Sequence, residues 1–309
     1  MNKPIIITGP TATGKTALGA LLAKEINGEI ISADSMQIYK FMDIGTAKPT
    51  HEEMLGVPHH MIDIIPPWED YSAARYVAEA TKCIEEIFER GKQPIIVGGT
   101  GLYIDSLVAG REFSARGNNE HRRILEEKYD NLGGEKMLLL LESYDPESAS
   151  KLHANDKKRI VRAIEVYETT GTTISKHNMD GVNHPVRFQT LKYALTFTSR
   201  AQLYTRIDRR VDDMISRGLE KEVTNLLSMG LHPNATAMQA IGYKEMTTVL
   251  KGDTTLEEAI ENIKMQSRRY AKRQLSWLRR DSQTKWIAWN DTPDIYRGVR
   301  EIMEQYEAK

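Results

Sequence analysis

Short apolar runs alternate with helical patterns along the first half of the chain. Runs typical of buried strands occupy residues 4–8, 29–34, 93–100 and 191–197. Apolar residues recur at helical spacing after the first run, and a second helical pattern spans residues 72–90 behind a capping Ser72. A loop-rich stretch runs from Asp34 to about residue 71. Because strands alternate with helices, we expect an α/β protein whose parallel sheet is covered on both faces.

The stretch from residue 111 to residue 189 has a different character, because it is polar and rich in helical segments. These are expected near residues 121–129, 136–143 and 156–169. Residues 137–141 would also suit a strand, but the good helix formers that flank them favour a helix. After residues 191–197, helices dominate from 199 to 280, and 285–289 form a candidate last strand. We therefore expect a core of residues 1–110 and 190–309, with a helical insertion domain at 111–189.

The composition is ordinary for a globular protein, with 28% charged residues and a net charge of −1, so total charge gives no indication of a nucleic-acid partner. The single cysteine, Cys83, excludes an intrachain disulfide and a cysteine metal cluster. Its apolar neighbours indicate a buried helix position. No apolar run approaches the ~18 residues of a membrane span, and no cationic leader precedes the first strand. We expect a cytoplasmic monomer without membrane contact.

A glycine-rich segment directly follows the first strand. It consists of Gly9, Pro10, Thr11, Ala12, Thr13, Gly14, Lys15 and Thr16, the G-x-x-x-x-G-K-T pattern of a phosphate-binding loop, or P-loop. Its backbone N–H groups, the following helix N-terminus and Lys15 suit a phosphate, and the Thr16 hydroxyl suits Mg²⁺. A glycine turn that caps a helix is the alternative. The strand before it and the helix after it favour a P-loop that binds a di- or triphosphate with Mg²⁺ as cofactor.

Other polar residues at strand ends decide which phosphate chemistry fits. The strand at 93–98 ends in Gly-Gly-Thr without the second acid that nucleotide hydrolysis usually needs. Ligands of open parallel sheets bind beyond the carboxyl ends of the strands, so Thr11, Lys15, Asp34 and Thr100 should meet in one crevice. A turn role is the alternative for Asp34 and for Thr100. Arg206 and Arg210, four residues apart, could bind a leaving diphosphate or simply be solvated.

A basic segment lies near the C-terminus. Residues 266–285 contain seven lysines and arginines against one acid, Asp281. Apolar residues such as Ala271 and Leu278 occupy the opposite arc of the helix. A packed helix with a cationic outer face suits a nucleic-acid backbone, although a solvated charged face would look the same. A second basic patch, Lys157, Lys158, Arg159 and Arg162, falls in the insertion.

Several strings together resemble the bacterial tRNA dimethylallyltransferases, which prenylate adenosine 37 beside the anticodon. The resemblance covers almost the whole chain and implies a P-loop NTPase-like core. Its most restrictive strings are Asp-Ile-Gly-Thr-Ala-Lys-Pro at 43–49 and Gly-Gly-Thr-Gly-Leu-Tyr at 98–103. The P-loop at 9–16 and the segments 32–39, 240–244 and 269–274 also match. The zinc finger of eukaryotic relatives is absent, as the single cysteine requires.

The resemblance implies transfer of a dimethylallyl group from its diphosphate to N6 of adenosine 37, with release of diphosphate. The P-loop with Mg²⁺ and Arg206 would bind the diphosphate, Arg210 would assist its departure, Asp34 would act as general base, and Thr11 and Thr100 would orient the reactants. The tRNA anticodon stem-loop is the expected partner, with adenosine 37 turned out of its loop. The expected RNA contacts are Asp34, Ser35, Met36, Gln37, Arg122, Lys158, Arg159, Arg162, Gln239, Gly242, Tyr243, Lys244, Arg268, Arg269, Lys272 and Arg273.

Three other functions remain open from the residues alone. A small-molecule kinase would use the P-loop for ATP, but it leaves the basic helix without a role. A non-catalytic RNA-binding module leaves the P-loop opposite Asp34 unexplained. Prenylation of free adenine nucleotides is the nearest alternative, and the large insertion and the cationic helix favour tRNA over it.

Overall fold

The computed structural model describes residues 3–110, 119–177 and 186–307. Its contacts divide the chain into two units. The sheet unit comprises Met1–Val108 and Phe188–Lys309, and the helical unit comprises Ala109–Arg187. These boundaries lie two residues from the expected ones, and Arg111, the expected first residue of the insertion, lies outside the described residues.

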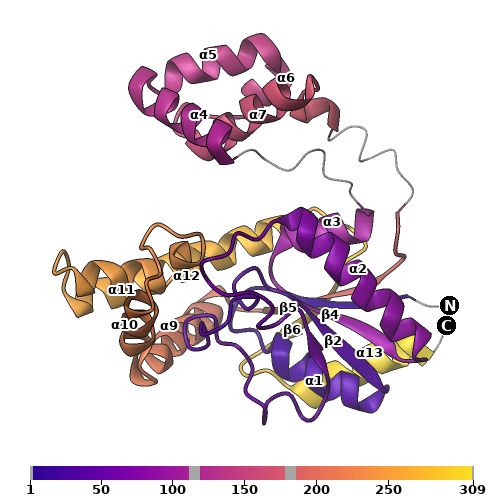
Figure 1. The fold of residues 1–309 in the computed structure, drawn as a ribbon. Helices are drawn as coiled ribbons and strands as arrows, with labels where there is room; N and C mark the ends of the chain where they lie inside the picture. Colours follow the sequence, from indigo (N-terminus) through magenta and orange to yellow (C-terminus); the bar gives the residue numbers. More distant parts are fainter. Residues whose placement is uncertain (1–2, 111–118, 178–185, 308–309) are drawn as a thin grey trace. The chain divides into compact units, whose positions relative to one another are not determined.

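The sheet unit is built on six parallel strands (Figure 1). Their spatial order is β3-β2-β4-β1-β5-β6. The strands are β1 (Ile5–Thr8), β2 (Gly28–Ala33), β3 (His59–His60), β4 (Gln93–Gly98), β5 (Leu191–Phe197) and β6 (Lys285–Trp289). At the centre, Ile6 pairs with Ile96 of β4 and Ile7 pairs with Tyr193 of β5. The P-loop therefore follows the central strand, and the parallel α/β fold with a P-loop-like core is confirmed.

Alternate side chains of the central strand enter two separate cores. Ile5 and Ile7 pack with α1 (Lys15–Glu25), α9 (Arg200–Ser216) and α13 (Ile295–Glu307). Ile6 packs with α2 (Ala73–Glu89) and α3 (Gly101–Ala109) on the opposite face (Figure 1). Burial on both faces explains why Ile5, Ile6 and Ile7 are all apolar instead of alternating with polar residues. Ser72 caps α2 by accepting from the Arg75 N–H, as the sequence predicts.

A third core lies beyond the strand ends and contains the loop that follows β2. Ile38, Tyr39, Met42 and Ile65 of this loop pack against a helical layer. The layer is formed by α9, α10 (Leu219–Ser228), the 3₁₀ turn Ala237–Gln239, α11 (Tyr243–Leu250) and α12 (Leu256–Leu278). The stretch predicted to be loop-rich is thus a packed segment, with Tyr39 and Ile65 forming a parallel bridge.

The helical unit has a core of its own. Its helices include α4 (Asn119–Leu132), α5 (Gly134–Tyr144), α6 (Pro146–Ala149) and α7 (Lys157–Thr170). Leu125, Met137, Leu141 and Ile160 are buried together at their contacts. Residues 137–141 are helical, so the preferred interpretation of this ambiguous segment is confirmed. None of the described helices of either unit is long and apolar enough to cross a lipid bilayer.

Candidate functional site

The P-loop contains two backbone positions that only glycine adopts easily. Gly9 and Gly14 have φ values of 142° and 87°, in the region that favours glycine. A Cβ atom on Gly9 would lie 2.5 Å from the Leu195 carbonyl oxygen of β5. The buried Thr13 hydroxyl donates to the Pro10 carbonyl at 2.8 Å, and the Trp289 indole N–H donates to the Thr13 carbonyl at 2.9 Å. The loop is therefore fixed from the inside and from β6.

A cavity of about 330 Å³ opens beside the P-loop, within the sheet unit. Its polar lining includes Thr11, Lys15, Thr16, Asp34, Arg210 and Gln274. Its apolar lining includes Ile207, Val211, Met214, Ile241 and Ile263. The cavity thus combines a phosphate-binding end with a wall suited to a hydrocarbon group. Of the crevice residues predicted from the sequence, it brings together Thr11, Lys15 and Asp34.

Two cations in the cavity are held in unfavourable surroundings. Burial and the neighbouring Arg210 lower the pKa of Lys15 to about 7, although Asp34 acts in the opposite direction. Burial also lowers the pKa of Arg210, which makes no hydrogen bond or ion pair with any residue that the structure describes. Two adjacent cations without a salt bridge are suited to an anionic ligand. Arg206 instead donates to the Ala12 carbonyl at 3.1 Å and braces the P-loop.

Asp34 stands at the end of β2 in a turn that fixes its carboxylate. Its Oδ1 accepts from the Met36 N–H at 2.9 Å, as in the turn role left open by the sequence. The next residue, Ser35, donates its N–H to the Thr100 hydroxyl at 3.1 Å, which brings the ends of β2 and β4 together. Tyr270 of α12 reaches the same place, and its pKa is raised to about 12 by burial and by Asp34. Asp34 therefore faces the cavity from a rigid turn, and Thr100 supports that turn.

Gln274 is a central residue to which the sequence analysis gave no role. The Thr11 N–H donates to its Oε1 at 3.1 Å, and its Nε2 donates to the Gly99 carbonyl at 3.0 Å. One buried side chain on α12 therefore joins the P-loop to the turn after β4. A Cβ atom on Gly99 would lie 2.2 Å from that Nε2, so any side chain there would displace the Gln274 amide. The available signal was a glutamine on the apolar arc of the helix, between Ala271 and Leu278.

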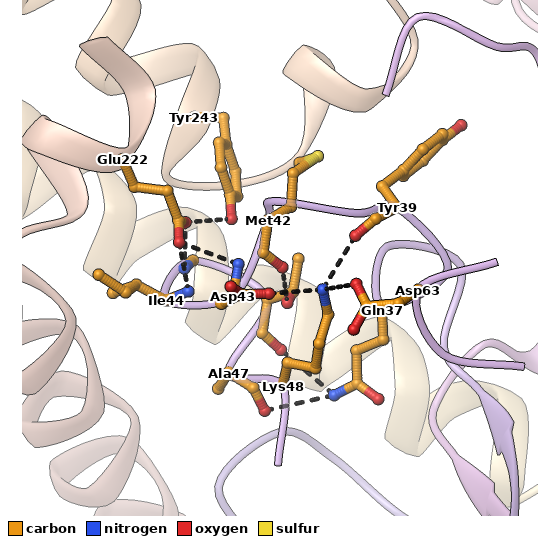
Figure 2. Close-up of polar contacts among 12 residues, drawn as sticks. Gln37, Tyr39, Met42, Asp43, Ile44, Ala47, Lys48, Asp63, Glu222 and Tyr243 are labelled. Atoms are coloured by element: carbon orange, nitrogen blue, oxygen red, sulfur yellow. Dashed lines mark hydrogen bonds and ion pairs between the residues drawn. The ribbon is translucent and has the colours of Figure 1, made fainter. Parts of the chain in front are cut away.

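Residues 43–49 are called here the 43–49 loop. This loop and the preceding Met42 are held by a network of polar contacts (Figure 2). Glu222 of α10 accepts the N–H groups of Asp43, Ile44 and Gly45. Lys48 is buried and donates to the Tyr39 carbonyl at 2.9 Å and to the carboxylates of Asp43 and Asp63. This motif was predicted from resemblance alone, and neither Glu222 nor Lys48 was singled out.

The cationic face of α12 is partly neutralised. Arg268 donates from Nη1 to both carboxylate oxygens of Asp208 of α9, at 2.6 and 2.8 Å, so much of its charge is used within the protein. Arg269, Lys272 and Arg273 line a shallow hollow with Ser276, Trp277 and Arg280. Arg273 also borders the main cavity. The exposed part of the face is therefore centred on 269–280 instead of beginning at 268.

The helical unit presents only part of its predicted basic patch. Lys158 and Arg159 are exposed. Arg122 and Arg162 both pair with the fully buried Glu165, at 3.1 and 2.9 Å. A buried carboxylate needs such partners, so these two arginines have a structural role in the helical unit.

Residues 239–244 likewise include both exposed and buried side chains. Gln239 and Lys244 are exposed, as expected for RNA contacts. Gly242 and Tyr243 are buried, and the Tyr243 hydroxyl donates to Glu222 at 2.6 Å. This corrects the expectation that Tyr243 contacts RNA, because its ring belongs to the core of the helical layer. Burial and Glu222 together raise the pKa of its hydroxyl.

Comparison with known proteins gives matches over nearly the whole chain. A family model described as IPP transferase matches residues 37–281, and one described as isopentenyl transferase matches residues 3–66. A tRNA dimethylallyltransferase of Thermoanaerobacter sp. (strain X514) is 50% identical over 300 residues, which cover 96% of this chain and 94% of the relative. The enzyme of the same name from Carboxydothermus hydrogenoformans is 53% identical over 287 residues, covering 93% and 92%.

Solved structures agree with these matches. The full-length tRNA isopentenylpyrophosphate transferase of Bacillus halodurans has a TM-score of 0.75 at 41% identity and covers 100% of this chain and 96% of its own. A eukaryotic dimethylallyltransferase acting on tRNA has a TM-score of 0.81 at 30% identity, with coverage of 99% and 80%. The family model matches most of the chain, and its relatives share about half of their residues with it. The chain therefore belongs to the IPP transferase family.

Proposed function

We propose that this protein transfers a dimethylallyl group from dimethylallyl diphosphate to N6 of adenosine 37 in the anticodon stem-loop of tRNA. The observation that carries the proposal is the single cavity in which the P-loop, two cations without a salt bridge, the Asp34 carboxylate and an apolar wall meet. The related tRNA dimethylallyltransferases support the choice of donor and acceptor.

The diphosphate end of the donor fits the P-loop, Lys15 and Arg210, and its hydrocarbon end fits the apolar wall formed by Ile207, Val211 and other residues. The Thr16 hydroxyl lines the cavity without a hydrogen bond to any described residue, so it is available to Mg²⁺. Mg²⁺ binds such sites through few protein ligands together with phosphate oxygens and water. The ion would supply further positive charge for the departing diphosphate.

In the reaction, the bond between N6 and the allylic carbon forms while the bond from that carbon to the diphosphate oxygen breaks. Asp34 accepts the proton that N6 loses, and the electron pair of the broken bond leaves with the diphosphate, where Lys15 and Arg210 stabilise its charge. The turn held by Thr100 keeps Asp34 in place for this transfer. The exposed cations of α12 lie beside the cavity and suit the phosphates of the bound RNA.

The test is incubation of the purified protein and Mg²⁺ with radiolabelled dimethylallyl diphosphate and unmodified tRNA. We expect label in the tRNA, and none in a transcript whose nucleotide 37 is changed. Label transferred to free adenine nucleotides but not to tRNA would contradict the acceptor. Turnover of ATP with a small acceptor, without transfer of label, would favour a kinase instead.

A further inference from the structure

The 43–49 loop forms part of the cavity wall. Gly45, Thr46, Ala47 and Pro49 all line the cavity, on a segment that is neither helix nor strand. An irregular wall keeps its shape only if its backbone groups are bound by fixed partners. The groups that hold this loop therefore decide the shape of the site.

One carboxylate holds the first half of the loop. Glu222 accepts three consecutive backbone N–H groups, from Asp43 at 2.9 Å, Ile44 at 2.8 Å and Gly45 at 3.1 Å (Figure 2). Its fourth donor is the buried Tyr243 hydroxyl at 2.6 Å. An ionised carboxylate only accepts, so it suits four converging donors in a way that an amide does not.

The fit around this carboxylate is close. A Cβ atom on Gly45 would lie 2.3 Å from the Tyr243 ring, so the loop rests directly on the residue that Glu222 binds. The N-terminal end of α11 is itself closed by a hydrogen bond from the Gly242 N–H to Glu245 at 2.8 Å. Glu222 thus connects the loop to two helices, α10 and α11.

The second half of the loop is linked to the turn that carries Asp34. The Gln37 amide donates to the carbonyl oxygens of Thr46 and Ala47, at 3.4 and 3.3 Å, and its own oxygen accepts from the Ser32 hydroxyl at 3.1 Å. A shift of the loop would therefore move Gln37 and the turn on which Asp34 lies. The P-loop is held separately, by Gln274, Trp289 and Arg206.

We propose that Glu222 is a positioning residue for the acceptor: by binding the N–H groups of residues 43–45, it keeps the loop and the Asp34 turn in the arrangement that receives the nucleic-acid base. This inference rests on the proposed function. The role distinguishes the two substrates, because binding of the acceptor depends on Glu222 and binding of the diphosphate does not.

The test compares Glu222→Gln with Glu220→Gln, an exposed glutamate on the same helix. We expect Glu222→Gln to raise the KM for tRNA at least fivefold, while the affinity for inorganic diphosphate, measured by calorimetry, stays within twofold. Glu222→Asp keeps the charge and should recover part of the loss. Tyr243→Phe removes one donor and should shift the KM for tRNA in the same direction by a smaller factor.

Three outcomes would overturn the positioning role. These are an unchanged KM in Glu222→Gln, equal losses for both substrates, and no recovery in Glu222→Asp. If Glu222→Gln does not fold, Glu222→Asp and Tyr243→Phe provide the test instead. The KM for tRNA should again change more than the affinity for inorganic diphosphate. Failure of the wild-type protein to prenylate any tRNA would instead contradict the proposed function, so the two failures are distinguishable.

Discussion

Asp34 is the residue on which the proposed chemistry depends most directly. Its carboxylate lies in the cavity at the end of β2, and no other described carboxylate lines that cavity. We expect Asp34→Ala to lower kcat by about a hundredfold or more, the usual contribution of a general base. Asp34→Asn keeps the shape but cannot take a proton, so it should be equally slow. Single-turnover transfer assays measure this effect.

The affinity of Asp34→Ala for tRNA serves as the control. It should stay within a few-fold of wild type in filter-binding experiments, because the main phosphate contacts are expected on α12. A large loss of binding with normal turnover at saturating tRNA would contradict the role of general base.

Gln274 gives a prediction about stability. Gln274→Ala leaves the part-buried Thr11 N–H and the buried Gly99 carbonyl without their partner, and one buried polar group left in this state costs about 1–3 kcal/mol. The free energy of unfolding in urea should fall by at least this amount. Gln274→Glu keeps an acceptor for Thr11 and should lose less. Equal stability of the alanine variant and the wild type would contradict the role assigned to the bridge.

The sequence was enough to predict those site residues that belong to short motifs in the chain. The P-loop, Asp34 and Thr100 each belong to a short motif at the end of a strand, and all lie at the same edge of the sheet. Gln274 and Glu222 were not predicted, because their partners lie 263 and about 178 residues away along the chain. Cations were easily found, but Arg122 and Arg268 show why their partners were not: Glu165 and Asp208 come close to them only when the helices pack.

At the scale of the element, α12 has two opposite roles. Its buried side fixes the P-loop through Gln274, and its exposed side presents Arg269, Lys272 and Arg273. Replacing all three residues by Glu should weaken tRNA binding. The slope of log Kd against the logarithm of the salt concentration should fall by about 2. Affinity for dimethylallyl diphosphate should change little.

A matched control reverses three exposed cations elsewhere in the sheet unit. Lys24, Lys82 and Arg300 lie on α1, α2 and α13. Their reversal changes the net charge by the same amount but leaves the exposed face of α12 intact, so it should leave the salt slope nearly unchanged. Equal slopes for the two triple variants would indicate a general charge effect and contradict a binding face on α12.

The first residues of β2 give a prediction about pH. Glu29 is nearly inaccessible, and burial alone would raise its pKa, but hydrogen bonds from Lys92, Arg90 and His60 outweigh burial and hold the pKa at about 2. Its folded pKa lies below its unfolded value near 4.5, so the stabilisation is present above that value and is lost as the pH falls towards 2. Urea unfolding of Glu29→Gln should show a weaker decline in stability over this interval than the wild type. Parallel pH profiles would contradict this account.

The elements themselves were predicted where the apolar pattern was strong. The five longer strands follow apolar runs, and α2 follows a capped helical pattern. The two-residue strand β3 was not predicted, because His59 and His60 have no apolar pattern and enter the sheet only by pairing with Ile30 and Ile31. The short helix α3 and the C-terminal α13 were also absent from the sequence analysis.

At the scale of the whole molecule, the two units have separate cores. Leu141 is fully buried in the helical unit, and Leu22 is fully buried in the sheet unit. Each change to alanine should cost about 2–5 kcal/mol, the usual range for a buried leucine. Because the cores are separate, we expect calorimetry to resolve two transitions, with Leu141→Ala lowering one and Leu22→Ala lowering the other. A single transition lowered by both variants would show that the units unfold together.

The chain leaves the sheet unit after Val108 and returns at Phe188, and the Phe188 N–H donates to the Val108 carbonyl at 3.4 Å. The two cut points of the insertion are therefore already neighbours in space. A protein engineer could replace residues 109–187 by a short turn, or by another domain whose termini are adjacent, without opening the sheet. The same geometry makes the fold modular: the helical unit can lengthen, shrink or be exchanged while the P-loop and its cavity are preserved.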